Sequence, residues 1–234
     1  MYGDETTNMN TGDRRPIAAR RLRVFAAIAA ALALARVSPN LISVLGMIAA
    51  VGAGVLLALS GAQWPGSMAE RGMLLLAAAL IQLRLMANLL DGMVAVEGGM
   101  RSATGELYNE APDRVSDVAV LVGAGYVAGG SMELGYIAAI GAVLVAYARA
   151  LGKGTGHPAD FRGPMAKQKR MFIVTVVSVW MAAAPVEWRG DWNVMDEGRG
   201  AMAIALAVIV LGCGVTFWRR VRLLAHRLRG GSGS

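Results

Sequence analysis

Six apolar segments dominate this sequence, and each approaches the roughly 20 residues that an α-helix needs to cross a lipid bilayer. They are Leu41–Ser60, Gly72–Leu90, Val115–Gly130, Leu134–Leu151, Met171–Pro185 and Gly200–Trp218. Charged residues make up 17% of the chain, whereas a soluble domain usually carries about 25%. We therefore expect an all-α integral membrane protein with six transmembrane helices in a single domain, residues 1–229. The terminal Gly230–Ser234 is expected to be an artificial tail.

The basic residues distinguish the two sides of the membrane. All of the Lys and Arg residues except Arg71, Arg84, Arg189 and Arg199 lie at the two termini, between segments two and three, or around the loop between segments four and five. The positive-inside rule places these parts in the cytoplasm, and we expect a bacterial inner (plasma) membrane. Interfacial tryptophans are expected in the opposite loops, which contain Trp64, Trp188 and Trp192. Topology and anionic lipids explain the net charge of +7, so no nucleic-acid partner is expected.

The segment Val24–Ala35 is apolar but too short to span a bilayer. It follows a basic stretch and ends in small residues, as a signal peptide does. Cleavage there would leave the mature N-terminus outside and contradict the charge distribution. We therefore expect an amphipathic helix that lies in the cytoplasmic membrane interface, before the first span.

Polar residues concentrate at the cytoplasmic end of segments two and three. Their spacing places Asn88, Asp91 and Ala95 on one helix face, and Asn109, Asp113 and Asp117 on another. Ionisable groups at membrane depth are costly unless they are paired or coordinated. Carboxylate and amide oxygens are the ligands that hard divalent cations prefer, so the two faces predict a site for Mg²⁺ or Mn²⁺. Each acid taken alone is also compatible with a solvated helix end, so the combination carries the prediction.

The stretch Asn88–Asp113 resembles the signature of the CDP-alcohol phosphatidyltransferases, D-x2-D-G-x2-A-R-x8-G-x3-D-x3-D. The spacing is kept throughout, and the matching residues are Asp91, Gly92, Ala95, Gly105 and Asp113. Three positions depart from the signature: Asn88 and Asn109 stand where Asp is usual, and Val96 replaces the Arg. The stretch Ser38–Ser43 is similar to the family's Pro-Asn start of the first span.

This resemblance implies a phospholipid biosynthesis enzyme, a transferase that moves a phosphatidyl group from CDP-diacylglycerol to an alcohol and releases CMP. It implies a homodimer and a pair of divalent ions, held at the positions of Asn88, Asp91, Asn109 and Asp113. Asp113 is also the implied general base. The nucleotide site would be lined by Asn88, Asp91, Gly92, Ala95 and Gly105.

The two amides change the expected charge of this site. An Asn side chain contributes an oxygen ligand but no negative charge. The candidates to compensate are Glu97, Glu106, Glu110 and Asp117, and Asp117 is best placed, one turn beyond Asp113. We predict either a rearranged two-ion site with Asp117 as a further catalytic residue, or a site with one ion. A third alternative is a family member that binds the nucleotide lipid without turning it over.

Basic residues lie at the end of the fourth segment and just before the fifth. In relatives with phosphorylated acceptors, residues of this region bind the acceptor phosphate, so we predict an acceptor site at Arg149, Lys167, Lys169 and Arg170. Positive-inside charge and lipid headgroups explain these residues equally well. Glycerol phosphate, inositol or its phosphate, serine and other alcohols all fit as acceptors. A transporter or scaffold is less favoured, because the acids cluster at one end rather than near the midplane.

Overall fold

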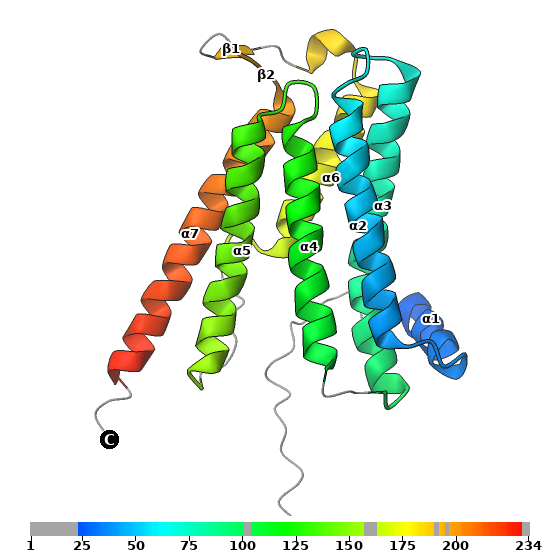
Figure 1. The fold of residues 1–234 in the computed structure, drawn as a ribbon, viewed down its shortest axis with the longest axis vertical. Coiled ribbons are helices and arrows are strands. Elements are labelled where there is room, and N and C mark those ends of the chain that lie inside the picture. Colours follow the sequence, from blue (N-terminus) through cyan, green and yellow to red (C-terminus); the bar gives the residue numbers. More distant parts are fainter. Residues whose placement is uncertain (1–22, 101–103, 157–162, 190–191, 195–196, 231–234) are drawn as a thin grey trace, which may run out of the picture.

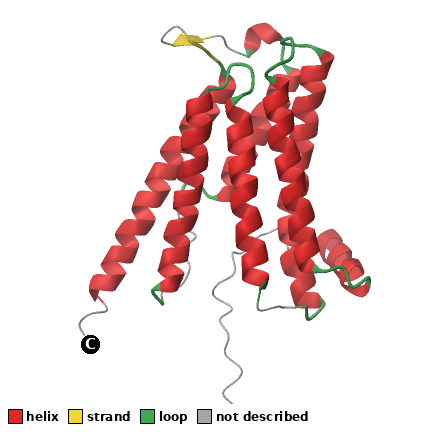
Figure 2. Ribbon diagram, in the orientation of Figure 1, coloured by secondary structure: helices red, strands yellow, loops and turns green. Residues whose placement is uncertain are grey.

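The computed structural model describes residues 23–100, 104–156, 163–189, 192–194 and 197–230. Within these ranges the chain is helical except for a short β-hairpin and the connecting loops (Figure 2). Figure 1 shows an upright helical bundle with one further helix lying against its lower end. The all-α prediction is therefore confirmed, apart from that hairpin.

The bundle consists of α2 (Pro39–Ser60), α3 (Met68–Glu97), α4 (Gly105–Gly125), α5 (Met132–Gly154), α6 (Lys167–Ala183) and α7 (Ala201–Gly230). The helix outside it is α1 (Arg23–Leu34). At the opposite end lie a 3₁₀ turn, Val186–Trp188, and the antiparallel strands β1 (Trp192–Val194) and β2 (Glu197–Arg199) (Figure 1). Apart from Gly230, the expected tail lies outside the described residues.

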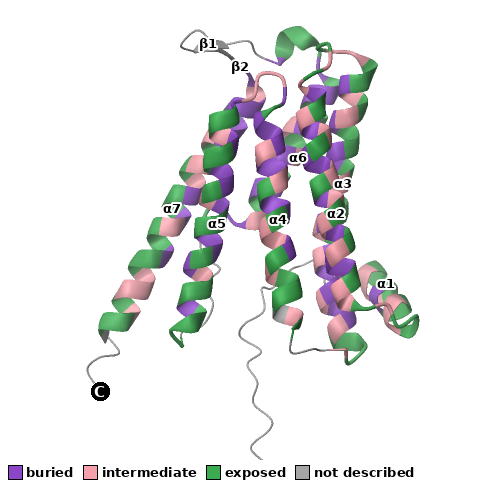
Figure 3. Ribbon diagram, viewed as in Figure 1, coloured by how far each residue is buried: buried purple, intermediate pink, exposed green. Residues whose placement is uncertain are grey.

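Within the described ranges, α2, α3, α5 and α7 are long and apolar enough to cross a membrane. Helix α4 has polar residues in its first turns, and α6 has 17 residues that begin with a basic stretch. Both belong to the same bundle, because α4 packs against α2 and α5 while α6 packs against α3. Much of the outward-facing surface of the bundle is exposed and includes many large apolar side chains (Figure 3).

Glycines allow α2 and α4 to touch along their backbones. A Cβ built on Gly54 would lie 2.3 Å from the carbonyl oxygen of Ala119, and one on Gly123 would lie 2.2 Å from the carbonyl oxygen of Gly54. Small residues at such crossings are the usual means of packing membrane helices. This contact fixes α4 against α2, on which α3 packs as well.

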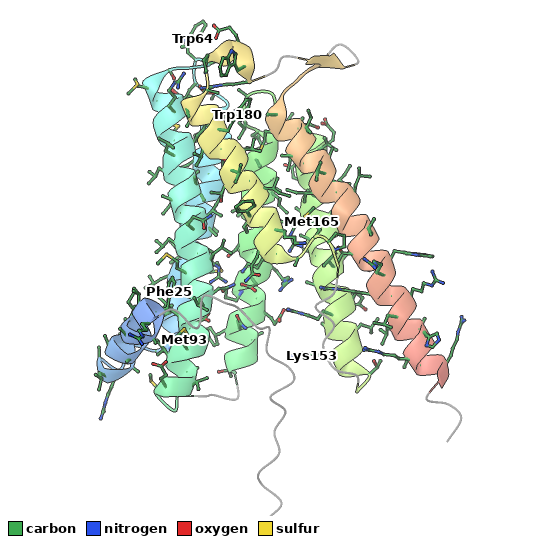
Figure 4. The ribbon with its side chains drawn as sticks, turned by 180° about the vertical axis from the view of Figure 1, so that it is seen from behind. Phe25, Trp64, Met93, Lys153, Met165 and Trp180 are labelled. Carbon is green, nitrogen blue, oxygen red and sulfur yellow. The ribbon has the colours of Figure 1, made fainter. Side chains whose placement is uncertain are left out.

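Helix α1 supports the end of α3 that carries the predicted site. Its one buried residue, Ala29, packs in a cluster with Met93 and Val94 of α3, and Phe25 adds to this cluster. Figure 4 shows Phe25 and Met93 close together at this end of the molecule. The rest of α1 is largely exposed, including Val24 and Leu34.

The segment before α6 is held inside the bundle by α7. The backbone N–H of Met165 donates to the Oγ1 atom of Thr216 at 3.0 Å. Gly163 has a φ of 137°, and a Cβ there would lie 2.4 Å from the Cγ2 atom of Thr216. A glycine meets both demands, because it has no Cβ and tolerates positive φ. Helix α6 thus begins part-way along the bundle, near Met165 in Figure 4. Its first residue, Lys167, is largely buried.

Candidate functional site

Arg84 is a fully buried arginine in the middle of α3, with 1% of its surface exposed. Its Nη2 atom pairs with Oδ1 of Asp113 at 2.6 Å, and its Nε donates to Oγ of Ser116 at 3.1 Å. Its Nη1 atom donates to the carbonyl oxygen of Ser43 at 3.4 Å. Gly46 leaves room for this group, since a Cβ at Gly46 would lie 2.8 Å from Nη1. Helices α2, α3 and α4 therefore meet around one guanidinium.

Asp113 of α4 is the acid on which the site converges. Besides Arg84, its Oδ1 atom accepts from Nδ2 of Asn88 at 2.9 Å and from Nζ of Lys167. The second oxygen, Oδ2, lies 3.9 Å from Nη2 of Arg114. Three donors thus share one oxygen, whereas the other is more lightly engaged. Hydrogen bonds of this charge-assisted kind are the stronger ones in proteins.

Asn88 and Asp91 contribute from α3, on the face that their spacing predicts. Because Asn88 turns its amide nitrogen to Asp113, its Oδ1 atom is left buried and has no hydrogen-bond partner among the described residues. Asp91 is 6% exposed, and its Oδ2 atom accepts from the hydroxyl of Ser43 at 2.5 Å. Buried acceptors are nearly always satisfied in folded proteins, so an unpaired oxygen here indicates a place for a ligand.

Asp117 lies one turn further into the bundle and is 1% exposed. Its Oδ2 atom pairs with Nη2 of Arg170 at 2.6 Å, and Nη1 of Arg170 donates to the carbonyl oxygen of Met165 at 3.0 Å. The Oδ1 atom of Asp117 is buried without a partner in the part of the chain that the structure describes. The catalytic role of Asp117 stays a prediction. Its unpaired Oδ1 is the atom that would take part, because Oδ2 is already paired with Arg170.

Glu110 links α4 to α5 near the mouth of the site. It pairs with Arg114 at 2.9 Å on its own helix, and with Arg149 of α5. Three of the four basic residues predicted to bind the acceptor therefore contact an acid of α4: Arg149, Lys167 and Arg170. The fourth, Lys169, is exposed.

The other predicted residues lie at the same end of the bundle. Gly92 and Ala95 are on the last turns of α3, Gly105 begins α4, and Asn109 is exposed one turn before Asp113. Of the residues proposed to compensate for the amides, Glu97 is exposed at the end of α3, and the side chain of Glu106 lies outside the described part.

Arg84 is the site residue that the sequence analysis missed. It stands four residues before Asn88 and so shares its helix face. A cationic side chain at membrane depth is itself a signal of function, because burying it is costly unless it is paired.

The comparisons with known proteins agree with this arrangement. The sequence matches the CDP-alcohol phosphatidyltransferase family over residues 36–218, which covers most of the chain. The chain belongs to the CDP-alcohol phosphatidyltransferase family. Its family is one of transferases, and the described residues contain four helices long and apolar enough to cross a membrane. The chain is therefore an integral membrane protein. The search of curated proteins returned no match.

Two solved structures of phosphatidylinositol phosphate synthase from Mycobacterium tuberculosis resemble this fold. The one with CDP-DAG bound has a TM-score of 0.68 and 20% identity, and the match covers 87% of this chain and 94% of that one. The one in complex with manganese and citrate has a TM-score of 0.67 and 20% identity, with 86% and 88% covered. At this identity the likeness shows the shared fold of the family.

The donor atoms of the site are of the kind that suits a divalent ion. Within the described residues, no three His, Cys, Asp or Glu side chains gather as a metal-binding group. The oxygens on offer are the unpaired Oδ1 of Asn88 and the carboxylates of Asp91 and Asp113. The positive charges of Arg84 and Lys167 equal the negative charges of Asp91 and Asp113 in number.

Proposed function

We propose that this protein transfers a phosphatidyl group from a CDP-linked lipid of the CDP-diacylglycerol type to an alcohol, with release of CMP. The observation that supports this best is the meeting of Asn88 and Asp91 with Asp113 at one end of α3 and α4, in the spacing of the family signature. Phosphoryl transfer requires positioning and neutralised charge more than covalent chemistry, and this site offers both.

In the proposed reaction the hydroxyl oxygen of the acceptor attacks the phosphorus that carries the lipid. The bond between this phosphorus and the CMP oxygen breaks, so CMP leaves with the bonding electron pair. The acceptor proton passes to Oδ2 of Asp113, the oxygen that is not shared by three donors. The same contacts on Oδ1 hold the carboxylate in place for this transfer.

The end of α3 and the start of α4 would bind the nucleotide. Gly92, Ala95 and Gly105 are small, so they let the backbone approach the cytidine and diphosphate. Mg²⁺ or Mn²⁺, when bound to Asn88, Asp91 and Asp113, would neutralise charge that develops on the diphosphate. Asn109 is the remaining proposed ligand. Its exposed position suits an outer contact of the nucleotide site.

The acceptor would enter from the side of α5 and α6. Lys167 is the residue best placed to meet it, because its ammonium group already lies at Asp113. Arg149, Lys169 and Arg170 complete the basic region that we propose attracts a phosphorylated or otherwise anionic acceptor.

We further propose six transmembrane helices, α2 to α7, with α1 in the cytoplasmic interface of a bacterial inner membrane, and a homodimer as in the family. Both described ends of the chain lie at the end of the bundle that holds the site (Figure 1), and this is the side expected to face the cytoplasm. Trp64 and Trp188 are exposed at the other end, where they would anchor the bundle in the outer interface.

The test uses purified protein with labelled CDP-diacylglycerol, Mg²⁺ or Mn²⁺, and a panel of alcohols. We expect CMP release together with one new phospholipid, which mass spectrometry identifies. Asp91→Ala should abolish both, whereas Glu187→Gln, a change at the opposite end, should leave both unchanged. If no alcohol in the panel gives CMP but the protein still binds CDP-diacylglycerol, the transferase proposal is wrong. The protein would then be a family member that binds the nucleotide lipid without turning it over.

A further inference from the structure

We propose that Arg84 and Lys167 take the place of one divalent ion in this site, so that the protein binds a single Mg²⁺ or Mn²⁺. This inference rests on the proposed function, because it concerns how the charges in the site are balanced during phosphoryl transfer. The number of bound ions is measured without an acceptor and without turnover, so the two proposals can fail separately.

Arg84 is built into the fold as a fixed cation. Each of its three nitrogens has a partner, in Ser116, Ser43 and Asp113, and the side chain is 1% exposed. An arginine stays protonated in proteins, so this positive charge is permanent. Because all of its nitrogens are engaged, Arg84 acts on Asp113 and not on the substrate. It is a positioning residue.

Lys167 supplies the second positive charge from a different helix. Its side chain is 14% exposed and its Nζ atom lies at the same oxygen of Asp113. The tether of Met165 to Thr216, two residues earlier, holds the start of α6 at this position. Two cations from α3 and α6 thus converge on one carboxylate oxygen of α4.

The charges then favour a single ion. Asp91 and Asp113 are balanced by Arg84 and Lys167, while the nearby Asp117 and Glu110 already have arginine partners. One divalent ion brings two positive charges, and the diphosphate of a CDP-linked lipid brings two negative ones. A second ion would leave an excess of positive charge in a poorly solvated site, which is costly.

Asn88 matches this arrangement. Its amide nitrogen donates to Asp113 at 2.9 Å, and its unpaired oxygen is left for the ion. A carboxylate at this position would face the carboxylate of Asp113, and two such groups at this distance require a cation or a proton between them. The amide at position 88 and the guanidinium at position 84 therefore act together: one avoids a further negative charge beside Asp113, and the other supplies a positive one.

The decisive experiment counts Mn²⁺ ions bound per chain in the purified, metal-stripped protein with saturating CDP-diacylglycerol and no acceptor, by equilibrium dialysis and by electron paramagnetic resonance of free Mn²⁺, after subtraction of the Mn²⁺ that CDP-diacylglycerol binds in detergent alone. We expect one Mn²⁺ in the natural sequence. The double variant Arg84→Met with Asn88→Asp removes the fixed cation and restores the acid, so we expect it to bind two. Asn88→Asp alone keeps Arg84, and here we expect one ion bound about tenfold more tightly.

Arg189→Met is the matched control, because it removes a buried arginine from an ion pair at the opposite end of the bundle. It should leave the count at one. Two ions in the natural sequence, or none, overturn the inference, as does a count of one in the folded double variant. If the double variant does not fold, Asn88→Asp decides, and a rise to two ions overturns the inference. A count of one with no CMP release in any assay would leave this inference standing and refute the transferase.

Discussion

Buried arginines pair with acids at both ends of this bundle, but the two ends are built differently. At the end with the hairpin, Arg189 pairs with Glu70 at 2.7 Å, and Arg71 donates to carbonyl oxygens at the C-terminal end of α6, such as that of Ala182 at 2.6 Å. At the other end, three donors from two helices converge on a single oxygen of Asp113. One cation per acid, with backbone partners, is the pattern of a structural clasp. Unpaired buried oxygens occur at both ends among the described residues, at Oε1 of Glu70 and at Oδ1 of Asn88. Two cations and an amide on one oxygen are therefore what distinguishes the end with Asp113 as the candidate ligand site.

The largest difference between the two ends should appear in activity. We expect Asp113→Asn to lower the rate of CMP release by about 10²- to 10⁴-fold, because the general base and a carboxylate ligand are lost together. Glu70→Gln should leave the rate per folded molecule unchanged, since Glu70 belongs to the clasp. Initial rates, normalised to the folded fraction from size-exclusion chromatography, test this. Equal losses of CMP release in both variants would show that the two ends do not differ in their role in catalysis.

Stability should show the opposite ranking. Arg189→Met leaves Glu70 buried and without its cation, so we expect a loss of about 3–5 kcal/mol in the free energy of unfolding. Lys167→Met removes one of three donors to Asp113, so we expect a loss of about 1–2 kcal/mol. Unfolding of both variants in the same detergent measures the difference. A Lys167→Met variant as unstable as Arg189→Met would show that the site is as tightly closed as the clasp.

A glycine pair tests how the site is packed. In Gly46→Ala the added methyl group would lie 2.7 Å from Cβ of Ala87 and 2.8 Å from Nη1 of Arg84. We expect a loss of about 1–3 kcal/mol and slower CMP release, because the guanidinium must move. Gly72→Ala, on α3 near the other end, meets nothing within 4 Å, so we expect a gain of up to about 1 kcal/mol. Thermal unfolding and initial rates are the measurements, and destabilisation by Gly72→Ala would contradict the packing described.

The smallest effect is expected at Lys169. It is exposed, unlike Lys167 two residues earlier, so Lys169→Ala should change stability by less than about 0.5 kcal/mol. Loss of one charge from the basic region should raise the KM for an anionic acceptor slightly and leave kcat unaltered. Steady-state kinetics with the acceptor found in the panel would show this. A marked fall in kcat would place Lys169 inside the site.

Hydropathy predicted the middle of the bundle helices better than their ends. The predicted span Gly72–Leu90 became Met68–Glu97, since helix α3 continues through polar turns that hydropathy does not detect. Helix α7 likewise runs on past Trp218 to Gly230 through a basic stretch. The strands β1 and β2 were expected as loop, because three-residue strands leave no pattern in the sequence.

The family signature placed Asn88, Asp91 and Asp113 at one end of two helices, and the structure brings Asn88 to Asp113. It could not predict the partner of Arg84. That pair joins residues 29 positions apart, and it forms because α3 and α4 pack on α2 in one particular register. Local spacing along a helix can be read from the sequence, whereas contacts between helices depend on packing.

The depth of Arg84 also bears on how the chain is made. During synthesis α3 reaches the membrane before α4, because Asp113 follows Arg84 by 29 residues. An arginine at the centre of a membrane helix costs about 2.5–3.5 kcal/mol on insertion when it is unpaired. The ion pair lowers this cost once α4 has arrived. Helices α3 and α4 are therefore expected to enter the bilayer together as a helical hairpin, so that assembly of the site and insertion of the chain are one event.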